Sequence, residues 1–236
     1  MRRLLLAALL SVTAAAAAAQ TTHTATFDLR LAGIRAGVVG FSAVEDGRQY
    51  SAAARVTSSG VVSLFRSFSY DARATGRITP RGLVPTRYME SADTGERVSR
   101  AAMDYVRGVP QVKAYDPPQE ARPTDIDPAT QGGTVDPMTA IYALLRDVPR
   151  AEVCTLSVPV FDGRRVSRVT TSGPRLDGDR IRCDGEYRRV AGFSDRQMRE
   201  KTRFAFSITY APAGDRYRVE RISLDTLYGT ATLDRR

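Results

Sequence analysis

Residues 203–210, with the sequence RFAFSITY, decide the fold class of this chain. Large apolar or aromatic side chains stand at every second position of this stretch, and smaller or polar side chains stand between them. Because successive side chains of a β-strand point to opposite faces, this alternation predicts a strand with one buried face. Residues 27–31, FDLRL, repeat the pattern near the N-terminus.

Turn signals separate many such runs at short intervals. Asp-Gly between alternating residues is a strong hairpin signal, because Gly tolerates the positive φ that the turn requires. The clearest case is Asp162-Gly163, a predicted two-residue turn between 158–161 and 164–171. Counting such runs predicts a mainly all-β chain of about eleven strands, arranged as an antiparallel curved sheet or a half-open β-barrel.

One segment, residues 136–147, has the chemistry of a helix. Asp136 can cap the first free N–H groups, and Pro137 fits the first helical position. Met138, Ile141, Leu144 and Leu145 follow at helical spacing, so one face must be buried. We expect this helix to pack on the concave side of the sheet, as a plug or a lid. A shorter helical turn is expected at 61–65.

The first nineteen residues have the parts of a secretory signal peptide: Arg2-Arg3, an apolar run from Leu4, and small residues ending at Ala19. A membrane anchor is the alternative, but a spanning helix needs about 20 apolar residues. We expect cleavage before Gln20, export by the general secretory route, a periplasmic location and no transmembrane span afterwards.

The remaining residues, 20–236, are expected to form a single β-rich domain, with 116–133 as an exposed proline-rich loop.

The chain has two cysteines, Cys154 and Cys183. An oxidising compartment allows them to pair. A redox-active pair is the alternative, but redox dithiols usually have the close spacing Cys-x-x-Cys. The wide separation here predicts a structural disulfide between strands.

The charge is strongly basic, at +9 for the whole chain, and almost all of the positive charge is arginine. Inside the cytosol this would indicate nucleic acid. For an exported chain we expect no nucleic acid, and the natural anionic partners are phospholipid head groups or lipopolysaccharide. The alternative is that the scattered arginines form an ordinary solvated surface.

Three segments resemble a bacterial exported family known as domain of unknown function 3108. They are residues 29–39 with 49–52, residues 135–140, and residues 160–165 with Cys154 before them and 183–187 after them. The resemblance implies an envelope protein of Gram-negative bacteria. The family brings no agreed activity, so it implies no catalytic residue. Its general look is similar to the open, curved half-barrels that carry lipoproteins across the periplasm.

Motifs for catalysis or metal binding are weak. The only histidine, His23, lies near the expected mature N-terminus, where chains are usually poorly ordered, so Ser-His-Asp and His-based metal sites lack a second member. We therefore expect no enzyme, no cofactor and no metal site. The carboxylates considered for acid/base work are Asp104, Asp116, Asp162, Asp184 and Glu186.

Aromatic and apolar side chains are the more suggestive set, as the lining of an apolar cavity or as ordinary core. The residues considered for this role are Phe27, Phe68, Tyr70, Tyr105, Met138, Ile141, Leu144, Phe204 and Phe206.

Three functions remain open on the sequence alone. The first is a non-enzymatic binding or assembly protein of the envelope that holds a lipid or other apolar ligand on the concave face, with a lipid or anionic envelope component as partner. The second is a structural or interaction module for another envelope protein, with a filled core and no ligand cavity. The third is a carboxylate-dependent hydrolase of an envelope polymer, which a pair of buried carboxylates facing one cleft would favour.

Overall fold

The computed structural model describes residues 20–59 and 68–236. The expected signal peptide, 1–19, and the helical turn expected at 61–65 lie outside the described residues. The strands of the first half are β1 (Thr21–Leu31), β2 (Ile34–Asp46), β3 (Gln49–Ser58), β4 (Ser69–Thr79), β5 (Gly82–Asp93), β6 (Val98–Val106), β7 (Val109–Pro110) and β8 (Ala114–Asp116).

The middle of the chain holds η1 (Pro128–Thr130), α2 (Pro137–Leu145) and η2 (Arg150–Glu152). The second half holds β9 (Ser157–Phe161), β10 (Val166–Asp177), β11 (Arg180–Ala191), α3 (Asp195–Glu200), β12 (Arg203–Ala213), β13 (Arg216–Thr226) and β14 (Gly229–Arg235). No helix among the described residues is long and apolar enough to cross a membrane.

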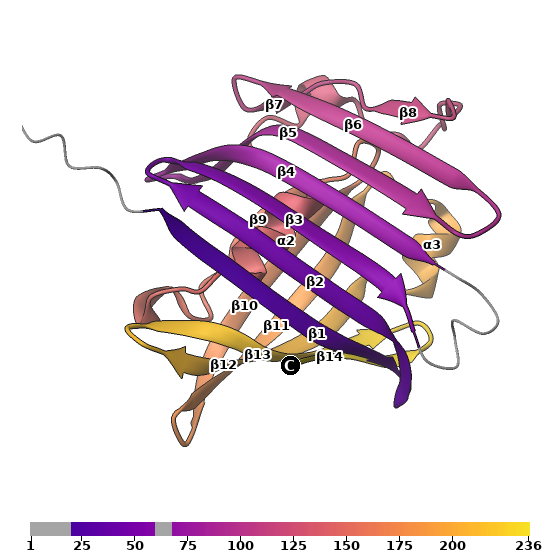
Figure 1. Cartoon of the computed structure of the whole chain (residues 1–236). Helices are drawn as coiled ribbons and strands as arrows, with labels where there is room; N and C mark the ends of the chain where they lie inside the picture. The colour runs from indigo at the N-terminus through magenta and orange to yellow at the C-terminus, as the bar shows by residue number, and fades with distance from the viewer. Residues whose placement is uncertain (1–19, 60–67) are drawn as a thin grey trace, which may run out of the picture.

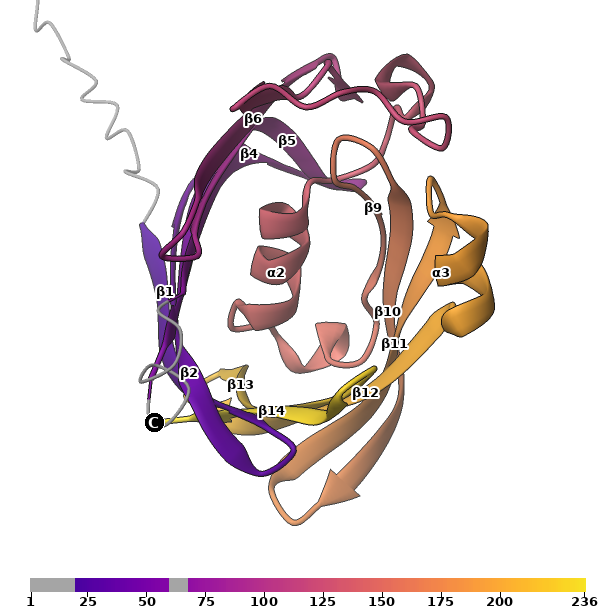
Figure 2. The same cartoon turned by 90° about the vertical axis from the view of Figure 1, so that its right-hand side faces the viewer.

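The described strands form one antiparallel sheet of fourteen strands, in the order β7-β6-β5-β4-β3-β2-β1-β14-β13-β12-β11-β10-β9, with β8 paired to β6. The sheet therefore consists of two meanders, β1 to β7 and β9 to β14, and the strand pairing that joins them is the one between β1 and β14. This pairing runs from Phe27 opposite Arg235 to Leu31 opposite Ala231. Figures 1 and 2 show this sheet curving round until its edges approach each other. The predicted antiparallel, half-open barrel is confirmed. The count of about eleven strands was low, since β7 and β8 span only two and three residues and leave no alternating pattern.

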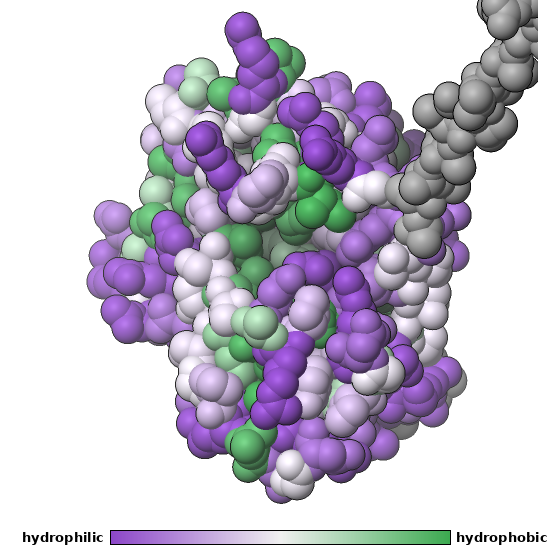
Figure 3. Space-filling view, turned by 90° about the vertical axis from the view of Figure 1, so that its left-hand side faces the viewer, coloured by the Kyte–Doolittle hydropathy of each residue, from purple (hydrophilic) through white to green (hydrophobic). Residues whose placement is uncertain are grey.

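The core lies on the concave face. The stretch 203–210 belongs to β12, and its four large side chains are all buried there. On the neighbouring strand, a Cβ built on Gly185 would lie 2.1 Å from Cε2 of Phe206, so only glycine lets that ring lie flat against β11. Figure 3 shows polar side chains around a hollow at the end of the sheet where β1 begins, with apolar side chains at its base.

Helix α2 lies inside the curve of the sheet (Figure 2), in contact with β3, β4, β5 and β9. Its placement on the concave side is confirmed. The cap is also as predicted, because Oδ1 of Asp136 accepts a 2.8 Å hydrogen bond from Thr139 N and Pro137 stands in the first turn. Of the four residues predicted to face the core, Met138 and Leu145 are buried, while Ile141 and Leu144 are partly exposed.

Both ends of α2 are pinned to the sheet by single β-bridges. Before the helix, Val135 forms a parallel bridge with Val160 of β9. After it, Val148 forms an antiparallel bridge with Tyr217 of β13. The disulfide between Cys154 and Cys183 follows a few residues later, with the two Cα atoms 5.4 Å apart. These links hold α2 as a plug across the concave face.

Two local expectations were wrong. Cys154 lies outside any strand, in a turn after η2 with φ of 65°, so the disulfide joins this turn to β11 rather than two strands. The Asp162-Gly163 turn has four residues, 162–165, because Oδ1 of Asp162 accepts the backbone N–H groups of both Arg164 and Arg165. Residues 116–133 are mainly exposed, as expected, and are interrupted by η1.

Candidate functional site

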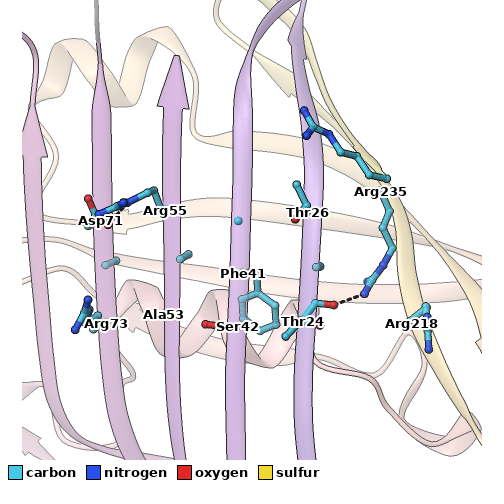
Figure 4. Close-up of a pocket in the computed structure, with 15 residues that line it drawn as sticks. Thr24, Thr26, Phe41, Ser42, Ala53, Arg55, Asp71, Arg73, Arg218 and Arg235 are labelled. Carbon is cyan, nitrogen blue, oxygen red and sulfur yellow. Dashed lines mark hydrogen bonds and ion pairs between the residues drawn. The ribbon is translucent and has the colours of Figure 1, made fainter. Parts of the chain in front are cut away.

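The outer face of β1 to β4 carries a trough with a volume of about 870 Å³ (Figure 4). Its floor follows from the strand register, which places Thr24 opposite Ser42 and Ser42 opposite Ala53 on successive strands. In the neighbouring row, Thr26 stands opposite Gly40. Because these outward positions carry small side chains, the surface is hollowed between longer side chains on either side.

Arginines dominate the walls of the trough. Five of them, with a single carboxylate, Asp71, line it: Arg55, Arg73, Arg218, Arg235 and Arg236. Figure 4 shows Arg55 beside Asp71 on neighbouring strands, and Arg218 and Arg235 on the opposite side. The Arg55–Asp71 pair is close, at 2.6 Å, and Arg236 pairs with Asp28 at 2.7 Å. Among the described residues, Arg73 and Arg218 have no ion-pair or hydrogen-bond partner, so the trough keeps uncompensated positive charge.

Arg235 is held rigidly in the trough wall. It stands where β14 ends, and its guanidinium donates to Val219 O of β13 at 3.1 Å and to Thr24 O of β1. It also lies over the ring of Phe27, 5.8 Å from the centroid. Partial burial lowers the pKa of Arg235 from its usual value, although it remains a cation at neutral pH. The side chain of Arg235 thus links β13 to β1 at the point where β14 itself ends.

The chemistry of this trough is that of anion binding. A guanidinium presents several N–H donors in a planar fork that matches phosphate and carboxylate groups. The volume lies within the range of about 300–1,000 Å³ that is usual for ligand sites. The one carboxylate that lines it, Asp71, is already paired with Arg55, so the trough offers no free acid/base group.

A first buried polar cluster surrounds Glu45. Its Oε1 atom accepts hydrogen bonds from Tyr142 Oη of α2 at 2.7 Å and from His23 Nε2 at 2.9 Å. Nδ1 of His23 accepts the backbone N–H of Asp147. Burial raises the pKa of Glu45, but the hydrogen bonds from His23 and Tyr142 outweigh it and lower the pKa to about 2. The expectation of a poorly ordered His23 was wrong, because β1 begins at Thr21 and His23 is only 2% exposed.

A second cluster surrounds Asp136. Its carboxylate accepts both the backbone N–H and the Oγ1–H of Thr139, whose hydroxyl lies 2.8 Å from Tyr50 Oη. The rings of Tyr50 and Tyr142 stack, with centroids 4.7 Å apart. Burial raises the pKa of Asp136 to about 6, against these hydrogen bonds.

A third cluster lies where the β6–β8 edge of the sheet meets the β9–β10 turn, a junction that we call the seam. Glu90 of β5 accepts hydrogen bonds from Tyr70, Tyr88 and Lys113, the last at 2.6 Å. Lys113 also donates to Asp162 O at 2.8 Å and is buried. Burial opposes ionisation of Glu90, but Lys113 and the two tyrosines hold its pKa below the usual value.

The geometry of these three clusters indicates a structural role. Each carboxylate is engaged by donors of the chain itself, and the three come from different elements. Of these three carboxylates, the sequence predicts a role only for Asp136, as the cap of α2. Glu45 lies near the end of β2 and Glu90 lies within β5, and no local pattern marks either as internal. Within residues 20–59 and 68–236, no three His, Cys, Asp or Glu side chains gather closely enough to hold a metal ion.

The carboxylates considered from the sequence are dispersed. Asp162 serves its turn, as predicted. The others lie in exposed or half-exposed ion pairs with different arginines: Asp104 with Arg87, Asp116 with Arg100, Asp184 with Arg175 and Glu186 with Arg203.

The aromatic and apolar set is largely core. Tyr70, Ile141 and Leu144 are partly buried and pack against the residues that are fully enclosed. Phe68 differs, because it precedes β4 and is 38% exposed. The hydroxyl of Tyr105 is buried without a hydrogen-bond partner. The buried members are Phe27, Tyr105, Met138, Phe204 and Phe206.

Comparison with solved structures shows the fold again. A crystal structure described as a beta-barrel-like protein of domain of unknown function DUF1849 from Brucella abortus is similar, with a TM-score of 0.50. The two sequences are 13% identical, and the similarity covers 91% of this chain and 95% of the other. At this identity the likeness concerns the fold alone. Comparison with curated proteins finds no match.

The family is shown by the sequence itself. The resemblance noted in the three segments above extends through both meanders and α2. The family described as protein of unknown function (DUF3108) matches residues 26–234, and the chain belongs to that family.

Proposed function

We propose that this protein is a non-enzymatic binding protein of the bacterial periplasm, and that it holds an anionic molecule in the outer trough. The observation that carries the proposal is the pair of unpartnered arginines, Arg73 and Arg218, in a trough of about 870 Å³ whose other charges are mostly positive. A phosphate or carboxylate bound there would receive charge-assisted hydrogen bonds, which are about twice as strong as neutral ones.

Two features support a periplasmic location. The first nineteen residues have the composition of a secretory leader. The Cys154–Cys183 disulfide is of the kind that persists in oxidising compartments. Outside the cytosol, phosphorylated lipids and polysaccharides are the abundant anions, so an arginine-lined surface meets them rather than nucleic acid.

Binding fits the site better than catalysis. The trough is open, and the one carboxylate among its lining residues is held by Arg55. The buried carboxylates, which a hydrolase would need, are satisfied inside the fold.

A structural or interaction module is the second candidate. The observation in its favour is the plug, because α2 covers the concave face with Met138, Thr139 and Tyr142 fully enclosed. Under this alternative the trough would contact an acidic surface of another protein and would have no affinity for a small anion.

Calorimetric titration of the protein from Gln20 onward with pyrophosphate tests the proposal. We expect binding that weakens with salt, and a loss of affinity of about tenfold or more in the double variant Arg73→Gln/Arg218→Gln. The matched control is Arg77→Gln/Arg81→Gln, which removes the same charge from exposed positions that do not line the trough.

Equal loss in both double variants would show attraction by net charge only, and would contradict a defined site. Absence of binding in the unaltered protein would also contradict it. Urea unfolding of each variant checks that the fold is intact.

A further inference from the structure

The trough continues into a second hollow that differs in character. This groove has a volume of about 520 Å³ and lies on the outer face of β4 to β6 and β8. It shares Arg55, Asp71 and Arg73 with the trough, so the two are continuous. Beyond Arg73 it is lined by Met89, Ala102 and Ala114, with no positive charge in that row.

The strand register aligns four residues in one row along this groove. Arg73 of β4 stands opposite Met89 of β5, Met89 opposite Ala102 of β6, and Ala102 opposite Ala114 of β8. Three steps between neighbouring strands amount to about 14 Å. The apolar floor covers the last two of these steps, about 10 Å, and begins beside an unpartnered arginine.

The apolar row is exposed to solvent. Met89 is 40% exposed, one of the large apolar side chains left on the surface. Beside it runs a polar row, Ser91, Arg100 and Asp116, in which Arg100 and Asp116 pair at 3.6 Å. That wall is therefore close to neutral and leaves Arg73 as the free charge at the head of the groove.

We propose that the continuous groove binds an amphiphile, with an anionic head group at Arg73, where the groove meets the trough, and one alkyl chain along Met89, Ala102 and Ala114. This inference rests on the proposed function for the head group and adds the class of ligand, a phosphate-bearing lipid. Burial of the alkyl chain removes apolar surface from water and so favours binding of the amphiphile over its head group alone.

The geometry favours an alkyl chain over a peptide. The row runs across the strands, and the backbone groups of β5 are committed to β4 and β6 on either side. An extended peptide laid along Met89 and Ala102 would therefore find no backbone donors or acceptors for its own polar groups. An alkyl chain has no such groups to satisfy.

Titration with two phosphate monoesters, methyl phosphate and dodecyl phosphate below its micelle concentration, tests the inference. We expect dodecyl phosphate to bind at least about tenfold more tightly. The variant Met89→Ser/Ala102→Asn should abolish this gain and leave the affinity for methyl phosphate unchanged. The matched control, Val98→Ser/Val106→Ser, alters exposed apolar residues of β6 outside the groove and should retain the gain.

Each failure points to a different claim. Equal affinity for the two esters, or a gain that survives in Met89→Ser/Ala102→Asn, would overturn the amphiphile and leave the anion site standing. Methyl phosphate binding that is insensitive to Arg73→Gln/Arg218→Gln would instead overturn the anion site, and with it the placement of the head group.

Discussion

Asp136 is both the cap of α2 and a buried ionisable group. The capping role could be predicted, since Asp before Pro at the start of an apolar run is a local signal. Its burial could not, because it depends on β3 and β4 covering the start of the helix. The same residue therefore stabilises the helix as its cap and destabilises the folded state when its buried carboxyl group ionises.

This destabilisation predicts a pH dependence. The pKa of Asp136 is about 6 in the folded protein against an ordinary value of 3.8. The folded state therefore binds the proton more tightly, and the associated stability is complete below pH 3.8 and is lost as the pH rises through 6. In Asp136→Asn, which cannot ionise, the free energy of unfolding relative to the unaltered protein should rise by up to about 3 kcal/mol between pH 4 and pH 8.

Urea unfolding of both proteins at a series of pH values measures this difference. Glu45 is present in both proteins, so its own titration at lower pH cancels. A difference that stays constant from pH 4 to pH 8 would show that Asp136 is not protonated in the folded protein near pH 5.

At the scale of the element, α2 is fixed rather than hinged. Bridges at Val135 and Val148 hold its two ends, and Tyr142 and Thr139 hold its middle to β2 and β3. The helical pattern of the sequence predicted the existence of α2, its start and the face of the sheet that it covers. It did not predict the polar contacts of Thr139 and Tyr142, because their partners lie 89 and 97 residues away in the chain.

A fixed plug predicts a large cost for truncating its core side chain. Met138 is fully buried, so Met138→Ala should lower the free energy of unfolding by about 2–5 kcal/mol. Leu144 is only partly buried, so Leu144→Ala on the same helix should cost less, below about 2 kcal/mol. Denaturant unfolding measures both, and a Met138→Ala variant as stable as the unaltered protein would indicate a detachable lid.

At the scale of the whole molecule, a buried lysine crosses the seam. Lys113 crosses from the chain before β8 to Glu90 of β5 and to the turn at Asp162. A Cβ on Gly163 would lie 2.3 Å from Cδ of Lys113, so the glycine of this turn also makes room for the lysine stem. The sequence signalled the turn, but the crossing depends on tertiary structure.

The two lysines of the chain offer a matched comparison. Lys113→Met should leave Glu90 without its cation and lower the free energy of unfolding by about 3 kcal/mol, and adding Glu90→Gln should recover part of the loss. Lys201 pairs with Asp225, which is 58% exposed, so Lys201→Met should cost less than about 1 kcal/mol. Equal effects in denaturant unfolding would show that the seam does not depend on Lys113.

The trough and groove mark the limit of prediction from sequence at this scale. Alternation assigns each residue to a face, and it places Thr24, Ser42, Ala53 and Arg73 outside. Only the register between strands brings them into one row, and register is set by turns and bulges such as the shift between Thr75 and Gly76. A basic surface was therefore predictable, whereas a cationic trough leading to an apolar groove was not.

The pairing of β1 with β14 also sets when the molecule can finish folding. Each meander forms from sequence neighbours, but Asp28 and Arg236, which pair across the join, are 208 residues apart. Until β14 emerges, β1 keeps a free strand edge, which is a template for aggregation. A chain threaded through a secretion pore from its N-terminal end would therefore leave one edge of its first strand unpaired for the whole passage, and a holdase that shields strand edges would act on β1 throughout that interval.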